Sequence, residues 1–522
     1  MPRTATNART STPCWRPPAG SWRTCWKNNP PRFVLKETVI QTLNRLQNTF
    51  SGLLQALYDP EGERRYRWFG MAWLLALSLG GALLWGKFLN WGNIPFDFHD
   101  WAEVNAPRLA FVRDAVLKGV LPLHMPDGSA LRNVTDRFMS LPDVILSPQV
   151  VLMRWMDVGP FVLVNTLLFY ALGAWGLLWF RRRFSLGLVS FSALFLLFNF
   201  NGHILTHMSI GHITWNGYFL FPWALALVFR LLDGDRSWRW VAKMALLLFF
   251  MFLNGSYHHF IWALLFLGLL ALGNWKCFWP VFKAGAFAVL LSMVRILPPA
   301  LHLSDFDDEF LGGYPTVMDM LSSLVAVKFP EQSLQVRSML SPLGWWEYSL
   351  YLGLLGTLFL AVFGVYRWLK NRQPQHGYPH LLLPILGISL LSLGRLYRLL
   401  RLIPIPLLSG ERASIRMIIL PVVVLLILAA GELQSWLRGR KLLPVEAIAG
   451  LGLLLGLGHD LWQHLKVWQV TNAFAAFPTT PVNLAIKVVA NHPDPAYITA
   501  LAAGATVSLI SLAILLFLAW KR

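Results

Sequence analysis

The feature that most constrains the fold is a series of apolar runs, each close to the length that crosses a bilayer, separated by short basic segments. A helix needs about 20 apolar residues to cross the hydrocarbon layer. Of the 522 residues, 56% are hydrophobic and only 14% are charged. We therefore predict an all-α, polytopic integral membrane protein with about twelve transmembrane helices. The predicted spans are 68–90, 159–180, 184–200, 214–232, 240–253, 260–273, 278–301, 348–368, 381–400, 417–433, 443–458 and 498–520.

Basic residues alternate along these spans in the way that the positive-inside rule requires. Arg64, Arg65 and Arg67 precede the first span, and Lys521 and Arg522 follow the last, with further basic residues after every second span between them. Cytoplasmic loops carry this excess of Lys and Arg. We predict that both termini are cytoplasmic, and we attribute the net charge of +19 to orientation and to anionic lipid rather than to nucleic acid.

Three regions precede or interrupt the predicted bundle. Residues 1–32 show no hydrophobic period, and we predict a disordered segment there. Residues 33–67 contain a helical stripe, which predicts a cytoplasmic amphipathic helix on the membrane surface or against a partner helix, followed by a juxtamembrane segment. Residues 68–522 form the predicted polytopic domain, with a long outer loop at 91–158 that contains interfacial helices.

The opening of that outer loop carries acidic groups directly after the first span. Asp97 and Asp100 flank His99 there. A carboxylate at this place can remove a proton from a hydroxyl group or bind a divalent cation, because neighbouring charges and a low dielectric tune its pKa. The alternative is an interfacial loop whose carboxylates are simply solvated.

Arginines collect near a late outer loop, which is the side of the membrane where they are least expected. These arginines predict an anionic ligand such as a lipid phosphate, since a guanidinium group binds phosphate with two parallel hydrogen bonds. The alternative is an interfacial helix whose arginines extend to the phosphates of bulk lipid. The arginines in question are Arg395, Arg398, Arg401, Arg412 and Arg416, with Arg295 near the outer end of an earlier span.

Histidines form a third group on the predicted outer side. His203 and His207 are four residues apart and share a helical face, and His212 and His258 follow on outer segments. No carboxylate near them in the sequence completes a metal-binding spacing, and the three cysteines do not form a thiolate site. We therefore favour contact with substrate or phosphate and assign no metal ligands, while a divalent cation stays open as a cofactor.

Together these segments resemble the GT-C superfamily of polyprenol-phosphate-sugar glycosyltransferases, including YfhO-like bacterial membrane proteins. The segments that carry the resemblance are Asp97 to Asp100, Asn201 to His212, Tyr348 to Gly353 and Glu411 to Arg416. The resemblance covers most of the chain from Trp68 onward. Walker, dinucleotide-binding and nucleophile-elbow motifs are absent from the sequence, in keeping with a lipid-linked donor.

The resemblance implies an enzyme of the bacterial inner membrane that moves a sugar from a polyprenyl-phosphate donor to a hydroxyl acceptor on the outer face. Asp97 or Asp100 would be the catalytic base. The donor phosphate would be bound by Arg295, Arg395, Arg398, Arg412 and Arg416, and the substrate by His99, His203, His207, His212 and His258. Membrane lipids would be the other partners, and the sugar and the acceptor stay open.

Two other functions fit the same layout. A transporter or flippase would use the outer arginines and histidines to line a path for a lipid-linked or anionic substrate, although such proteins usually show related halves with broken helices, and no internal repeat is visible here. A non-catalytic membrane assembly protein would keep the architecture without the chemistry.

Overall fold

A computed structural model describes most of the chain. The described residues are 32–96, 99–119, 147–300, 311–330, 336–337, 342–371, 378–403, 411, 413–440, 442–476 and 495–521. Asp97, Arg412, most of segment 1–32 and much of the outer loop 91–158 lie outside them, and so do the predictions made for these residues.

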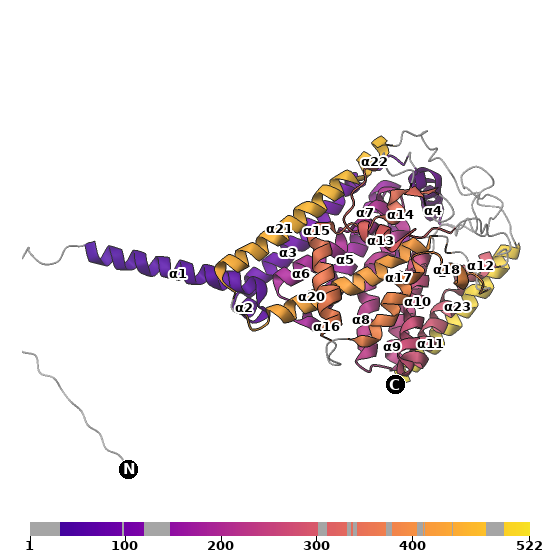
Figure 1. Cartoon of the computed structure of the whole chain (residues 1–522). Coiled ribbons are helices and arrows are strands. Elements are labelled where there is room, and N and C mark those ends of the chain that lie inside the picture. The colour runs from indigo at the N-terminus through magenta and orange to yellow at the C-terminus, as the bar shows by residue number, and fades with distance from the viewer. Residues whose placement is uncertain are drawn as a thin grey trace, which may run out of the picture. The chain divides into compact units, whose positions relative to one another are not determined.

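Helices account for most of the described residues (Figure 1). Up to residue 253 the α-helices are α1 (Arg32–Tyr58), α2 (Pro60–Arg65), α3 (Arg67–Phe88), α4 (Ala106–Lys118), α5 (Val158–Phe184), α6 (Leu188–Asn199), α7 (Gly202–Ser209), α8 (Phe221–Leu232) and α9 (Trp238–Leu253). Those that follow are α10 (Tyr257–Gly273), α11 (Phe278–Leu291), α12 (Met293–Ala300), α13 (Val317–Ser322), α14 (Trp345–Tyr348), α15 (Gly353–Phe359), α16 (Trp368–Lys370), α17 (Leu382–Leu391), α18 (Tyr397–Leu400), α20 (Ile419–Leu437), α21 (Pro444–Val467), α22 (Val470–Ala476) and α23 (Pro495–Lys521).

Segments of 3-10 helix, of π-helix and of strand lie between these α-helices. The 3-10 segments are η1 (Asn90–Gly92), η3 (Pro148–Arg154), η4 (Ile213–Leu220), η5 (Trp275–Cys277), η9 (Pro379–Leu381) and η10 (Ser414–Ile418), and the π-helical segments are η2 (Trp101–Asn105) and η8 (Leu360–Arg367). Strands β1 (Val336–Arg337) and β2 (Pro342–Leu343) form one short antiparallel ladder.

The prediction of an all-α polytopic membrane protein is confirmed. Within the described residues, eight helical stretches are long and apolar enough to cross a membrane: Arg67–Phe88, Val158–Phe184, Leu188–Ser209, Ile213–Leu232, Trp345–Lys370, Ser414–Leu437, Pro444–Val467 and Ile498–Lys521. The other four predicted spans coincide with shorter helices. Two of these are α9 and α10, and the predicted spans 278–301 and 381–400 are each divided, into α11 and α12 and into α17 and α18.

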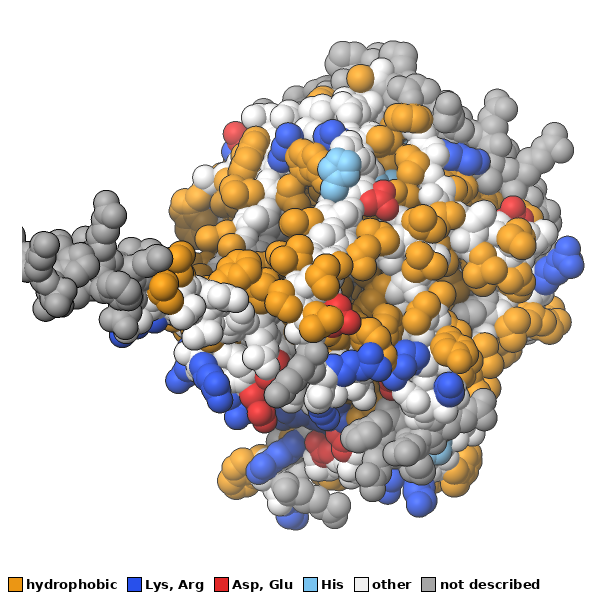
Figure 2. All heavy atoms as spheres, turned by 60° about the vertical axis from the view of Figure 1, so that its left-hand side comes forward, with side chains coloured by type: hydrophobic (Ala, Val, Ile, Leu, Met, Phe, Trp, Pro, Cys, Tyr) orange, Lys and Arg blue, Asp and Glu red, His pale blue; other side chains and the backbone are white. Residues whose placement is uncertain are grey.

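Burial separates the central helices from the peripheral ones. The most apolar window of the stretch Leu188–Ser209 is 94% buried, and that of Ser414–Leu437 is 83% buried, whereas α3 reaches only 22%. Exposed side chains on α3 follow a single helical stripe: Trp68, Met71, Leu75, Leu79 and Leu83. Figure 2 shows hydrophobic side chains over much of one face, with Lys and Arg side chains gathered below them. An apolar surface of this kind fits lipid rather than water.

The loops predicted to be cytoplasmic meet at one end of the bundle. Arg181, at the carboxyl end of α5, pairs with Glu63 of α2, and Arg183 pairs with Asp233 after α8 at 2.6 Å. At the other end of α5, Asp157 pairs with Arg113 of α4 at 2.6 Å. Because a helix rises about 1.5 Å per residue, the 27-residue α5 holds these two loop sets about 40 Å apart. Loops predicted to be cytoplasmic therefore lie at one end of α5, and the predicted outer loop lies at the other end.

The chain divides into two compact units, Met1–Gly52 and Leu53–Arg522. Most of α1 belongs to the first unit, and there the predicted helix is present with Leu43, Leu46 and Phe50 exposed. In the second unit the last residues of α1 are buried, and the Tyr58 hydroxyl donates to the carbonyl oxygen of Ala447 at the start of α21.

Candidate functional site

The candidate site begins with two buried histidines on the short helix α7. Asn201 caps this helix, because its side-chain oxygen accepts a hydrogen bond from the backbone N–H of Ile204 at 3.2 Å. His203 and His207 lie one turn apart, with ring centroids separated by 4.4 Å. Nδ1 of His207 is 2.9 Å from the carbonyl oxygen of His203, so this nitrogen carries the proton and donates it.

A glycine turn after α7 brings a third histidine to an acidic residue of the outer loop. Gly211 has φ 106° and is followed by His212, whose Nε2 lies 2.9 Å from Oδ2 of Asp100. His99 approaches the other carboxylate oxygen of Asp100 at 3.3 Å. Burial alone would raise the pKa of Asp100, but the contacts with His212 and His99 outweigh it and hold this pKa well below its usual value. Asp100 is therefore a carboxylate anion at neutral pH.

Replacement of Gly211 by Ala is expected to destabilise the protein by about 1–3 kcal/mol, because the residue would keep a left-handed conformation and its new Cβ would lie 2.5 Å from the backbone nitrogen of Trp101. The measurement is the unfolding midpoint of the detergent-solubilised protein. Gly452→Ala is the matched control, since a Cβ there meets no described atom within 4 Å and Ala favours a helix. An unchanged midpoint in Gly211→Ala would contradict the described turn.

An ion pair joins two helix ends beside these histidines. Glu347 of α14 is 5% exposed, and both of its oxygens accept hydrogen bonds from Arg416 of η10, from Nε and from Nη2, each at 2.5 Å. Such a two-point contact is the strongest form of a guanidinium–carboxylate pair. Oε2 of Glu347 also lies 3.4 Å from Nε2 of His207. The ion pair and the histidines of α7 therefore belong to one cluster.

A second carboxylate approaches Arg416 through His258. Nδ1 of His258 donates to Oε2 of Glu411 at 2.8 Å, and Nε1 of Trp262 donates to the same oxygen at 2.8 Å. Nη1 of Arg416 is 3.4 Å from Nε2 of His258, which fits the tautomer with the proton on Nδ1. Burial alone would raise the pKa of Glu411, but His258, Arg416 and Trp262 together lower it. Glu411 therefore also carries a negative charge.

The indole ring of Trp215 lies at the centre of these groups. The ring of His207 stacks on it with a centroid distance of 4.7 Å, and the ring of His212 lies at the same distance. The guanidinium carbon of Arg416 lies 5.0 Å from the indole centroid, which is a cation–π contact. We call the whole group the histidine cluster. Its members are Asp100, His203, His207, His212, Trp215, His258, His259, Glu347, Glu411 and Arg416.

The members of the histidine cluster range from fully buried to partly exposed. His203, His207 and His259 are at most 1% exposed. The side chains of Asp100, Arg416 and His258 are 20%, 16% and 15% exposed. These three side chains have the largest exposed fractions in the cluster, so they are the members that a ligand can reach most readily.

Only part of the predicted arginine group contributes to the histidine cluster. Among the described residues, only Arg416 of the predicted phosphate-binding set belongs to the histidine cluster. Arg395 and Arg398 are exposed at and near α18, while Arg295 of α12 donates to the carbonyl oxygens of Phe252 and Leu253 at 3.2 Å. Arg395 and Arg398 lie together on the short segment at α18, and Arg295 lies on α12, so none of the three is a member of the cluster. Their role in binding the donor phosphate stays a prediction.

The predicted histidines, in contrast, do come together. His203, His207, His212 and His258 all lie in the cluster, and His99 reaches it through Asp100. Sequence reasoning missed Glu347, Glu411 and Trp215. Glu411 sits inside a motif that the resemblance had already marked, but Glu347 carries no local signal, because its partners come from distant parts of the chain.

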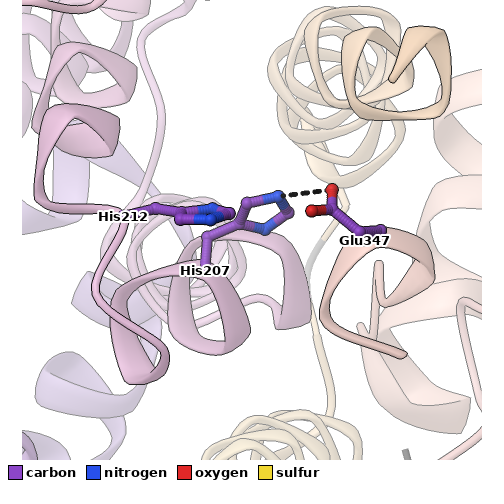
Figure 3. A group of neighbouring side chains, drawn as sticks. All are labelled: His207, His212 and Glu347. Carbon is purple, nitrogen blue, oxygen red and sulfur yellow. Dashed lines mark ion pairs between the residues drawn. The ribbon is translucent and has the colours of Figure 1, made fainter. Parts of the chain in front are cut away.

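Three members of the cluster could hold a metal ion. His207, His212 and Glu347 each offer one ligand atom, and these atoms all lie within 4.8 Å of one another. Figure 3 shows the three side chains gathered from α7, from the turn after it and from α14, with the contact between His207 and Glu347 marked. The carboxylate that the sequence lacked near the histidines is therefore supplied from much further along the chain.

No protein-family model, curated protein or solved structure matches this chain. The resemblance to the GT-C superfamily therefore remains a prediction.

Proposed function

We propose that this protein is a membrane glycosyltransferase that moves a sugar from a polyprenyl-phosphate donor to a hydroxyl acceptor. The observation that carries the proposal is a partly exposed carboxylate, Asp100, and a partly exposed guanidinium group, Arg416, on one buried cluster at one end of a bundle of membrane-spanning helices. A base and an anion-binding group are the two functions that this transfer requires.

In the proposed reaction Asp100 accepts the proton of the acceptor hydroxyl. The acceptor oxygen forms a bond to the anomeric carbon while the bond from that carbon to the phosphate oxygen breaks, and polyprenyl phosphate leaves with the electron pair. A single displacement of this kind inverts the anomeric configuration. The contacts of Asp100 with His212 and His99 fix the direction of the carboxylate and keep it ionised, and the same contacts lower its basicity.

The guanidinium group of Arg416 would stabilise the negative charge that develops on the leaving phosphate. Its Nε and Nη2 donate to Glu347, whereas among the described residues Nη1 makes only the long 3.4 Å contact with His258. Nη1 is therefore the donor most easily turned toward a phosphate oxygen. We assign the cluster to the outer face of a bacterial inner membrane, as the positive-inside pattern predicts.

The test uses the purified full chain in liposomes that contain a polyprenyl-phosphate sugar labelled in the sugar, together with a pool of hydroxyl compounds as acceptors. Loss of the label from the lipid into a water-soluble or protein-bound product supports transfer. An intact donor that changes leaflet would instead favour a flippase, and an intact donor that stays in its leaflet would favour a non-catalytic protein. Liposomes without protein measure spontaneous hydrolysis.

A double replacement of Arg395 and Arg398 by Gln is expected to weaken apparent donor affinity roughly tenfold or more, since each arginine near an anionic lipid surface contributes about 1 kcal/mol. These residues lie near Gly394, whose backbone contacts Gly313, beside the pairing of Gly312 with Ala413 that precedes Arg416. The matched control replaces Arg438 and Arg440, at the opposite end of α20. Equal donor KM values in the two double variants would remove Arg395 and Arg398 from donor binding.

A further inference from the structure

We propose that His207, His212 and Glu347 form a binding site for a divalent metal ion of the zinc type. This metal site does not depend on the proposed sugar transfer, because metal content can be measured without an enzymatic assay. His207 and Glu347 are buried to at least nine-tenths, and His212 is 9% exposed.

The protonation of the His207 ring leaves one nitrogen available for a metal ion. Its Nδ1 donates to the carbonyl oxygen of His203, so the lone pair of the neutral ring is on Nε2. That atom is buried and has no hydrogen-bond partner among the described residues. It faces Oε2 of Glu347 at 3.4 Å. Two atoms bound to one tetrahedral zinc ion at about 2.0–2.1 Å lie roughly 3.3 Å apart, so this separation fits an ion bound between them.

The protonation of the His212 ring likewise leaves one nitrogen available for a metal ion. Its Nε2 lies 2.9 Å from a carboxylate oxygen of Asp100, which fixes the proton on that nitrogen. The lone pair is then on Nδ1, which is buried and also lacks a hydrogen-bond partner in the part of the chain that the structure describes. Metal-binding histidines usually donate their other N–H to a carboxylate or a backbone carbonyl, and both histidines here do so.

The histidine cluster carries an excess of negative charge. Asp100, Glu347 and Glu411 are the three carboxylates of the histidine cluster, and Arg416 is its one guanidinium group. With neutral histidines the cluster therefore carries a net charge of −2. Buried charges are normally paired, because an unpaired ion loses its solvation. A divalent cation would balance this charge.

The donor set indicates the class of ion. Two imidazole nitrogens and one carboxylate oxygen match zinc and similar transition metals, whereas calcium and magnesium prefer oxygen ligands alone. Three protein ligands leave a fourth position open for water or for a substrate oxygen. Arg416 would hold the Glu347 carboxylate in place as an outer partner.

The test measures the metal content of the full chain, purified with an affinity tag that contains no histidine. After chelation and dialysis against zinc, wild-type protein is expected to hold one zinc ion per chain, with nitrogen and oxygen but no sulfur in its X-ray absorption spectrum. His207→Gln and His212→Gln are each expected to weaken zinc binding more than about 100-fold, because loss of an outer partner alone costs about 10–100-fold.

His259→Asn is the matched control, since His259 is equally buried beside Trp215 and is not in the proposed ligand set. It should keep the zinc. Equal zinc binding by wild type and both ligand variants would overturn the site, and so would no zinc in folded, zinc-treated wild type. The wild-type measurement can overturn the site even if the ligand variants do not fold. Zinc binding without sugar transfer would refute only the proposed function.

Discussion

Asp100→Asn is expected to lower the rate of sugar transfer about 100- to 10,000-fold, which is the usual contribution of a general base. An amide cannot take the proton of the acceptor hydroxyl, although it has nearly the shape of the carboxylate and can still accept a hydrogen bond from His212. The expected loss is in kcat rather than in donor KM. The measurement is the initial rate of label transfer in the liposome assay, with the unfolding midpoint as the check on folding.

Asp114→Asn is the matched control for this variant. Asp114 is a carboxylate of the same predicted outer loop, but it pairs with Lys118 one turn further along α4 at 2.7 Å. Its replacement should leave transfer unchanged. A wild-type rate in Asp100→Asn would remove Asp100 as the base. Asp97→Asn, at the other acidic position of the motif, would then show whether that residue has the role.

Arg416→Met is expected to destabilise the protein by about 3–5 kcal/mol, because it leaves Glu347 as a buried charge without its guanidinium partner. The double variant Glu347→Leu/Arg416→Met should recover much of this loss, since an apolar pair leaves no buried charge behind. The measurement is the free energy of unfolding in mixed micelles with increasing SDS, and a double-mutant cycle isolates the coupling between the two residues.

The control for this variant is an exposed ion pair of the same kind. Asp157 is 78% exposed and pairs with Arg113 at 2.6 Å, so Asp157→Asn should change stability by no more than about 1 kcal/mol. If Arg416→Met were as mild as Asp157→Asn, the buried ion pair would not be a main stabilising contact of the cluster.

The sequence predicted the fold well because length and hydropathy are local properties. Each of the twelve predicted spans coincides with helical structure, and the basic loops that alternate along them meet in ion pairs such as Arg183 with Asp233. The breaks inside two spans were missed. In the span 381–400, the helix breaks near Gly394, which has φ 81°. A single glycine in an apolar run is not enough to predict such a break.

The site was predicted only in part. A sequence motif shows which reactive side chains are present, but it does not show which residues from other segments lie beside them in the fold. The histidines of the segment Asn201 to His212 come together since they lie on one helix and the turn after it. Arg416 meets Glu347, and Arg395 does not, because that choice depends on how α14, α18 and η10 pack against one another. The hydrophobic pattern of a membrane helix shows that it spans, but its packing partners depend on side-chain fit.

The composition of the histidine cluster has a consequence for biosynthesis. Asp100, the histidines of α7 and Glu347 are all synthesised before Arg416 leaves the ribosome. Until η10 and α20 are inserted, the acidic side chains have no guanidinium counter-ion, and the half-built interior holds uncompensated negative charge. The last fifth of the chain, from η10 onward, therefore acts as the closing step of assembly. Chains that stop before it would carry a defect that cellular quality control can detect as exposed polar groups within the membrane.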